Sequence, residues 1–159
     1  MRLGQEIQAL SWGPFRGPVV DRAERAEPMT CPLLRVVAAA VRDRHGNVLI
    51  AQRPDGKHMA GRWEFPGGKI GEHESERMAL ERELREELGI EVLAARRSLE
   101  RTFDYPDRRV SLAFWIVDDY RGRPEPRDAQ VLSWVPIGEL GRHDVLEADR
   151  PFIELLQAL

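Results

Sequence analysis

Three glutamates, Glu83, Glu86 and Glu87, lie in the segment with the clearest helical pattern of the chain. At about 100° per residue they fall on one arc of about 100° of the helix surface. Like charges at these spacings repel each other by about 0.2–0.5 kcal/mol per pair on an isolated helix. Magnesium binds such carboxylates together with water and phosphate oxygens. The pattern therefore favours a divalent-cation site, and the alternative is a solvated acidic face relieved by Arg82 and Arg85.

Two glycines, Gly67 and Gly68, precede this segment and follow Pro66. Glycine lets the backbone approach a ligand closely and exposes a carbonyl oxygen. Most Gly-Gly pairs after proline are plain turns, so the pair alone is a weak signal. Leading into a helix with three glutamates, it indicates a ligand site much more strongly.

The helix that must position the glutamates is predicted over residues 75–88. Ser75 can cap its start and Gly89 can end it. The stripe next to the glutamates is apolar and would anchor the helix in the core, which leaves the glutamates at the edge of a cleft. This stripe consists of Leu80, Leu84 and Leu88.

The other elements are short strands and a terminal helix. Strands are predicted at 34–41, 48–52, 90–93, 99–104, 109–120 and 131–135, with a short extended piece at 63–65 and a helix at 151–159. We expect the first two strands to form a hairpin around a polar turn. Strands that surround one strong helix indicate an α+β fold, with helices packed on a mixed β-sheet.

Composition limits the class of protein. The chain has 159 residues, about one domain, and a formal charge of 24 − 27 = −3, which argues against nucleic-acid binding through phosphates. The single cysteine, Cys31, excludes an internal disulfide framework and a Cys-rich zinc site, so a reducing cytoplasm is expected. The longest apolar runs have six residues, whereas a membrane span needs about 18, so none is expected. Residues 1–33, which contain several glycines and prolines, are predicted to be a disordered extension before a domain at 34–159.

The motif around the helix resembles the Nudix box. The matching residues are Gly68, Glu74, Arg82, Glu83, Leu84, Glu86, Glu87, Gly89 and Ile90. Within that family the chain looks most like the MutT-type sanitising enzymes. The stretches that carry this similarity are Arg53, His58-Met59-Ala60, Trp63 to Lys69, Tyr105-Pro106-Asp107-Arg108, and Ala148-Asp149-x-Pro151.

The resemblance covers residues 34–159 and implies a Nudix α/β/α sandwich. It implies hydrolysis of a nucleoside diphosphate linked to another group. For the MutT type, water attacks the β-phosphorus of a nucleoside triphosphate and releases the monophosphate and pyrophosphate. The favoured substrate is 8-oxo-dGTP, removed before a polymerase inserts it. The implied partner is thus a small nucleotide, with no nucleic acid and no membrane, and the protein is expected to be a monomer or a weak dimer.

The resemblance also assigns roles at matching positions. It implies that Mg²⁺, with Mn²⁺ as a substitute, is held by oxygen atoms of Gly67, Glu83, Glu86 and Glu87. Glu83 is the expected general base, directly or through a metal-bound water, and a purely metal-ligating role is the alternative. Arg82 is expected to orient the glutamates by a charge-assisted hydrogen bond, with a surface ion pair as the alternative.

Asp128 stands where the family commonly has a further glutamate on a mobile loop, so it is a candidate metal ligand. Its side chain is one methylene shorter, and a solvated loop aspartate is an equally weighted alternative. The Arg53 guanidinium is suited to a phosphate, and the Phe65 ring would either stack on a base or belong to the core. The expected substrate contacts are Arg53, His58, Glu64, Phe65, Pro66, Gly67 and Asp149.

Asp149 stands where the MutT type usually has asparagine. An amide both donates and accepts hydrogen bonds, which suits O6 and N7–H of 8-oxoguanine. A buried aspartate that keeps its proton would mimic the amide. An ionised aspartate would accept from an amino group, such as N4 of cytosine or the N1/N2 edge of guanine.

The resemblance leaves other functions open beside the hydrolysis of 8-oxo-dGTP. The first is hydrolysis of CTP or 5-methyl-dCTP, because MutT-like relatives with aspartate near the C-terminus include such enzymes. Dinucleoside polyphosphates and ADP-ribose rank lower, since no added substrate-reading segment is evident. An inactive nucleotide-binding Nudix module is disfavoured by the intact Glu83, Glu86 and Glu87. A plain metal-binding structural domain is disfavoured by the positions of Arg82 and Gly89.

Overall fold

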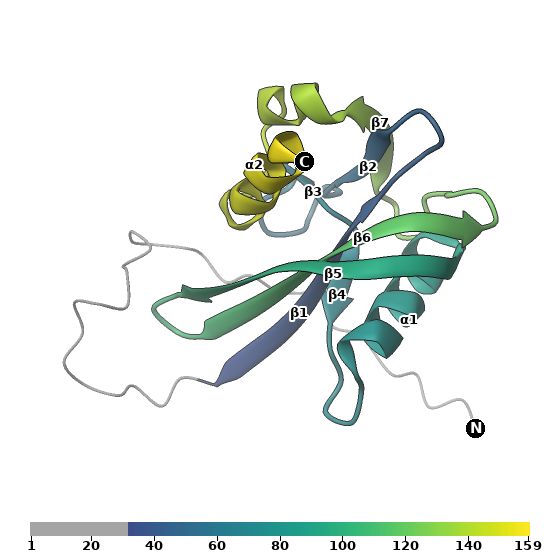
Figure 1. Cartoon of the computed structure of the whole chain (residues 1–159). Helices are drawn as coiled ribbons and strands as arrows, with labels where there is room; N and C mark the ends of the chain where they lie inside the picture. Colours follow the sequence, from purple (N-terminus) through teal and green to yellow (C-terminus); the bar gives the residue numbers. More distant parts are fainter. Residues whose placement is uncertain (1–31) are drawn as a thin grey trace.

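The computed structural model describes residues 32–159 (Figure 1). Except for its last two residues, the extension predicted at 1–33 lies outside the described residues, and Leu33 already begins the first strand. The strands are β1 (Leu33–Val41), β2 (Asn47–Gln52), β3 (Trp63–Glu64), β4 (Gly67–Lys69), β5 (Glu91–Asp104), β6 (Arg109–Arg121) and β7 (Val131–Pro136). The helices are α1 (Glu76–Leu88) and α2 (Arg150–Ala158), with short 3-10 turns η2 (Ile137–Arg142) and η3 (Glu147–Asp149).

The strands form two sheets. The larger has the order β4-β1-β6-β5, in which β1 runs parallel to β6 and the other pairs are antiparallel. The smaller has the order β3-β2-β7 and is antiparallel. The predicted mixed sheet and α+β class are therefore confirmed.

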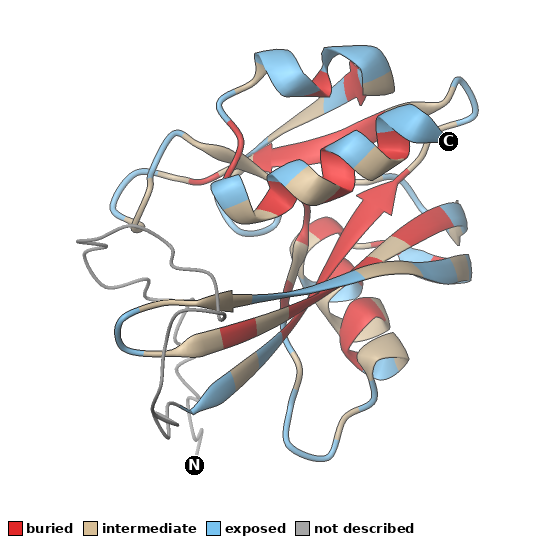
Figure 2. Cartoon of the chain, turned by 60° about the vertical axis from the view of Figure 1, so that its left-hand side comes forward, coloured by how far each residue is buried: buried red, intermediate tan, exposed pale blue. Residues whose placement is uncertain are grey.

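Strand β1 is buried on both faces, which is why its residues form an unbroken apolar run. Successive side chains of a strand point to opposite faces. Val37, Ala39 and Val41 pack with the leucines of α1, whereas Val36, Ala38 and Ala40 join the cluster that contains α2. The two helices accordingly cover opposite sides of the sheet (Figure 1), and buried residues gather on the central strand and the inward helix faces (Figure 2). This is the expected α/β/α sandwich.

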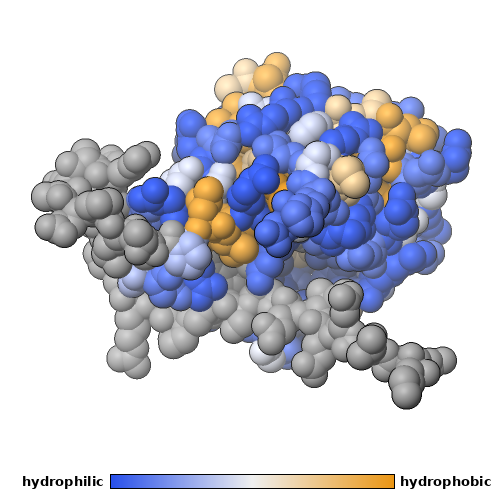
Figure 3. Space-filling model, turned by 90° about the horizontal axis from the view of Figure 1, so that it is seen from below, coloured by the Kyte–Doolittle hydropathy of each residue, from blue (hydrophilic) through white to orange (hydrophobic). Residues whose placement is uncertain are grey.

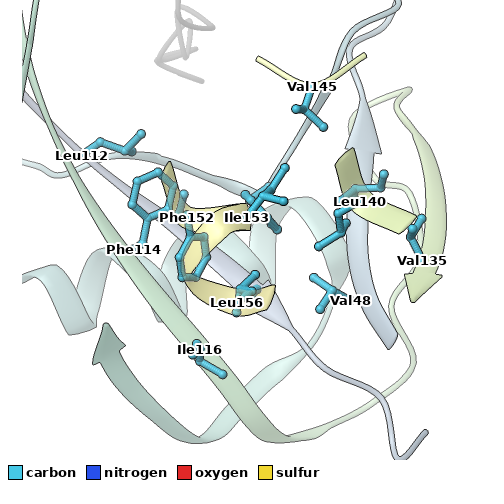
Figure 4. Packing of buried hydrophobic residues seen from close by; sticks show 14 of the residues in the cluster. Val48, Leu112, Phe114, Ile116, Val135, Leu140, Val145, Phe152, Ile153 and Leu156 are labelled. Carbon is cyan, nitrogen blue, oxygen red and sulfur yellow. The ribbon is translucent and has the colours of Figure 1, made fainter. Parts of the chain in front are cut away.

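The α2 side of the core is organised around aromatic rings. Phe114 of β6 and Phe152 of α2 stack with centroids 4.5 Å apart. Val48 and Val135 of the smaller sheet belong to the same cluster, together with Leu140 of η2 (Figure 4). This cluster thereby joins the two sheets and α2 into one core.

Two predicted features were wrong. The strands at 34–41 and 48–52 do not form a hairpin, because β6 and β4 occupy both edges of β1; only an isolated bridge, Arg42 to Val48, connects β1 with β2 before they enter different sheets. The separate strands predicted at 90–93 and 99–104 are one continuous strand, β5. Its polar middle pairs with β6 through several register shifts, and such bulges let a strand continue through an irregular pattern.

Within the described residues, no helix is both long and apolar enough to cross a membrane. The face shown in Figure 3 is mostly hydrophilic, and its hydrophobic residues lie in separate patches.

Candidate active site

Helix α1 begins and ends where its capping residues predict. The Ser75 hydroxyl accepts a hydrogen bond from Met78 N at 3.2 Å, and Gly89 ends the helix in the left-handed region at φ 71°. The predicted leucine stripe is completely buried and fixes the rotation of the helix about its axis. The buried residues are Ala79, Leu80, Leu84 and Leu88.

That rotation brings Glu83, Glu86 and Glu87 to a cleft of about 320 Å³, as predicted. The opposite wall is the backbone of Gly67 and Gly68. A Cβ atom on Gly68 would lie 2.3 Å from the carboxyl carbon of Glu83. Only glycine therefore lets β4 approach the carboxylates this closely.

Burial makes two carboxylates of this cleft, those of Glu83 and Glu87, costly to ionise. Burial raises the pKa of Glu87 to about 8, and the charges of Glu83 and Glu64 add to the effect. The backbone N–H of Gly67 partly opposes this shift by donating to Glu87 Oε2 at 3.1 Å. Burial also raises the pKa of Glu83, against the hydrogen bond that it accepts from Arg82.

Arg82 connects the helix to the loop before it. Its Nη1 donates to Glu83 Oε1 at 2.8 Å, its Nε donates to Glu74 Oε1 at 2.7 Å, and its Nη2 donates to the Lys69 carbonyl at 2.9 Å. Glu74 in turn accepts from Gly71 N at 2.9 Å. Arg82 is thus placed to orient Glu83, while Glu74 organises the loop.

The donor set fits a divalent cation. Several carboxylates face one cleft, Glu64, Glu83 and Glu87 are partly buried, and their mutual repulsion calls for positive charge. The backbone is close enough to supply a hard carbonyl oxygen as well. Among residues 32–159, however, no three Asp, Glu, His or Cys side chains are already gathered as a metal site. The side chains would therefore turn on binding, away from partners such as Arg82.

Two loops, one after β2 and one after β6, complete the cleft. Asp128 lies in its lining, and its Oδ2 is 2.6 Å from the Lys57 ammonium. Arg53 is buried, with its Nη1 2.7 Å from Glu64 Oε2 and its Nε donating to the His58 carbonyl at 2.8 Å. The structure thus brings Asp128, Arg53 and Glu64 to the cleft. His58 is not among the described residues that line it.

A smaller hollow adjoins the cleft at Glu64, Phe65, Gly67 and Gly68. Its walls are mostly apolar, and Asp149 lies among its lining residues. The apolar lining residues are Val36, Val37, Ala38, Phe65, Val110, Leu112, Leu146 and Ala148.

Asp149 is only 4% exposed, and its Oδ2 accepts from Phe65 N at 3.1 Å. Burial, followed by the charge of Glu64, raises its pKa to about 8. Burial therefore favours the protonated form of Asp149, which is the form that the first of the two alternatives at this position requires.

Of the two alternatives for the Phe65 ring, stacking on a base or a place in the core, the structure favours the core. The ring is 5% exposed and lies edge-on to Phe152 at 5.0 Å and to Phe114 at 6.4 Å. It belongs to the core, as an aromatic residue between buried elements commonly does. The contribution of Phe65 to the site is its backbone N–H, which holds Asp149.

The sequence analysis missed three polar residues that line the cleft: Lys57, Arg127 and Gln130. Gln130 Nε2 donates to the Glu87 carbonyl at 3.0 Å, and Arg127 N donates to the same oxygen at 3.0 Å. The loop between β6 and β7 thereby satisfies the C-terminal end of α1. No local pattern marks these contacts, because each joins segments far apart in sequence.

In this α/β/α sandwich, helix α1 presents several carboxylates to a cleft of about 320 Å³, an arrangement that suits a metal-dependent enzyme. The NUDIX domain model matches residues 32–156. The chain belongs to the Nudix family, whose hydrolases generally use divalent metal ions.

Individual relatives indicate which type of Nudix hydrolase the chain is similar to. The chain is 40% identical over 123 residues to a CTP pyrophosphohydrolase of Escherichia coli, covering 77% of this chain and 91% of the relative. It is 44% identical over 88 residues to an 8-oxo-dGTP diphosphatase of Proteus vulgaris, covering 55% of this chain and 79% of the relative. A solved MutT structure, from work on Aliivibrio salmonicida and Vibrio cholerae, superimposes with a TM-score of 0.70 at 34% identity, covering 80% of this chain and 98% of that one. These likenesses support a MutT-type Nudix hydrolase.

Proposed function

We propose that the protein is a Mg²⁺-dependent nucleoside triphosphate pyrophosphohydrolase that converts 8-oxo-dGTP into 8-oxo-dGMP and pyrophosphate. This reaction, in the cytoplasm, would sanitise the nucleotide pool and prevent mutation. The observation that carries the proposal is the buried Asp149 beside an apolar hollow that opens into the carboxylate-lined cleft. The 8-oxo-dGTP diphosphatase of Proteus vulgaris supports it as a relative.

The apolar walls of the hollow suit the faces of a base, and the carboxyl of Asp149 suits the oxidised purine. A neutral carboxyl offers one donor and acceptor oxygens, as an amide does. Asp149 would donate to O6 of 8-oxoguanine and accept from N7–H. Unmodified guanine has an acceptor at N7, which would face the accepting oxygen of Asp149 and lose one of the two hydrogen bonds.

The cleft would hold the phosphates. Gly67 O, Glu83, Glu86 and Glu87 are the proposed ligands of Mg²⁺, with Asp128 as a further candidate. When bound, the metal supplies positive charge that screens the phosphate oxygens. Glu83 would accept the proton of the attacking water, and Arg82 would hold Glu83 in place. The water oxygen bonds to the β-phosphorus, the bond from that phosphorus to the bridging oxygen of the α-phosphate breaks, and 8-oxo-dGMP leaves.

A second candidate function is hydrolysis of CTP or 5-methyl-dCTP. It is favoured by the 40% identity to the CTP pyrophosphohydrolase, of which the match covers 91%. It requires an ionised Asp149 that accepts from the N4 amino group of cytosine. The burial that raises the pKa of Asp149 opposes this state at neutral pH.

The test is a panel of 8-oxo-dGTP, dGTP, CTP and 5-methyl-dCTP with Mg²⁺ at pH 6–9, scored for pyrophosphate and for phosphate, on the wild type and Asp149→Asn. We expect pyrophosphate as product and a preference for 8-oxo-dGTP that falls as pH rises through about 8. Asp149→Asn should keep the preference and lose its pH dependence. A wild type that prefers CTP at every pH would establish the second candidate instead. Binding of nucleotides without turnover would indicate an inactive module.

A further inference from the structure

Lys57 and Asp128 join the two loops that border the cleft. Lys57 follows β2 and Asp128 follows β6 (Figure 1), and their charged atoms are 2.6 Å apart although the residues are 71 positions apart in sequence. Both residues line the cleft. The ion pair therefore sits at the place where a polyphosphate would enter.

The basic residues of the chain are distributed unevenly. Of the 24 lysines and arginines, only Lys57 and Lys69 are lysines. Both lie in the lining of the cleft. Lysine is a compact point charge on a flexible stem, whereas the arginine fork binds a carboxylate in a fixed geometry. A lysine is therefore the better choice where the cation must exchange one partner for another.

The surroundings of the pair favour such an exchange. Arg53, a neighbouring cation, already holds Glu64 and the His58 carbonyl. The side chains of Lys57 and Asp128 are 30% and 57% exposed, so solvent screens their attraction. Breaking a pair of this kind changes an equilibrium by about fivefold at most. Asp128 also lies close enough to Glu64 and Glu87 for its charge to raise their pKa.

We propose that Lys57 is a substrate-binding residue that leaves Asp128 and contacts the distal phosphates, the part of the nucleotide that departs as pyrophosphate. The choice of distal phosphates rests on the proposed function, since it assumes that the base occupies the hollow beside Asp149. Lys57, Asp128 and Gln130 line only the main cleft, and Asp149 lines only the hollow. Lys57 therefore lies outside the hollow, in the part of the cleft that is left for the phosphates.

The first experiment measures the accessibility of Lys57 in the full-length protein without any turnover. An amine-acylating reagent is applied with Mg²⁺ alone, with Mg²⁺ and inorganic pyrophosphate, or with Mg²⁺ and dGMP, and modified peptides are quantified by mass spectrometry. We expect pyrophosphate to slow acylation of Lys57 at least fivefold and dGMP to leave it within twofold. Equal acylation with and without pyrophosphate would overturn the proposal, and protection by dGMP would overturn the distal assignment.

The second experiment compares the affinity for pyrophosphate of variants at Lys57 and at Asp128. With Mg²⁺ saturating, Lys57→Met should raise the Kd of pyrophosphate by about tenfold or more, which is the effect of losing one charge-assisted hydrogen bond. Lys57→Arg should restore part of the affinity. Asp128→Asn should lower the Kd by up to about fivefold, because the phosphate no longer competes with a carboxylate.

The matched control is Arg44→Met, which removes one positive charge from an exposed turn outside the cleft. Its Kd should stay within twofold of the wild type. If Asp128→Asn weakens pyrophosphate binding as much as Lys57→Met does, the pair acts as one structural unit and the exchange is refuted. Because pyrophosphate is not a substrate, a failure of the proposed hydrolysis would leave these outcomes readable.

Discussion

Replacing Asp149 by asparagine should make the protein more stable, by an amount that grows with pH. The carboxyl is 4% exposed, and burial raises its pKa from 3.8 to about 8. Between these values the folded chain holds a proton that the unfolded chain releases, so the free energy of unfolding falls as pH rises. At about 1.4 kcal/mol per pH unit, the penalty is about 4 kcal/mol at pH 7 and levels off near 6 kcal/mol above pH 8. Asparagine never ionises, yet its oxygen still accepts from Phe65 N.

Urea unfolding of both proteins between pH 5 and pH 9 measures this difference. We expect it to rise from about 2 kcal/mol at pH 5 to its maximum near pH 8 and then to stay constant. The control is Asp144→Asn, at an aspartate whose side chain is 73% exposed. It should stay within about 0.5 kcal/mol of the wild type at every pH. A difference that is flat from pH 5 to pH 8, or an Asp149→Asn protein less stable than the wild type at pH 8, would refute the reasoning.

Three further substitutions separate catalysis from stability. Glu83→Gln keeps an acceptor for Arg82 and removes a repelling charge, so Tm should hold or rise while kcat falls about 10²–10⁴-fold; activity within threefold of the wild type would remove Glu83 from the role of base. Gly68→Ala places a methyl group 2.3 Å from the flexible end of Glu83, so we expect nearly unchanged Tm by calorimetry and at least tenfold lower kcat. Gly67→Ala places its methyl group 2.0 Å from the backbone oxygen of Val37, so here Tm should fall by several degrees; equal Tm for the two alanine variants would contradict this contrast.

The parts of the site that could be predicted from sequence are those encoded locally. Ser75, the leucine stripe and Gly89 determine where α1 begins, which face it buries and where it ends. Once the buried face of α1 is known, the spacing of the glutamates places them at the edge of the contact between α1 and the sheet. Gly67 and Gly68 are close to α1 in sequence, so their place opposite Glu83 also follows from the motif.

The parts that could not be predicted depend on pairing between distant segments. The hairpin failed because the partner of β1 along its full length is β6, about seventy residues later. Lys57 was overlooked because its partner Asp128 lies on another loop. The role of Phe65 was ambiguous because an aromatic ring beside a glycine loop can either stack on a ligand or pack in the core. Only its contacts with Phe114 and Phe152 decide between these two roles.

The carboxylates that suit the cleft to bind a cation also destabilise the fold in the absence of one. Burial of each leucine on its inner face contributes about 1.5–3 kcal/mol, which holds the helix against the repulsion among Glu83, Glu87 and Glu64 that raises the pKa of Glu87. A cation that binds only the folded state relieves this repulsion and stabilises the fold by mass action. Metal affinity and thermal stability are therefore linked through the same carboxylates. A variant that gains Tm by losing one of these charges should, for that reason, gain less from added Mg²⁺.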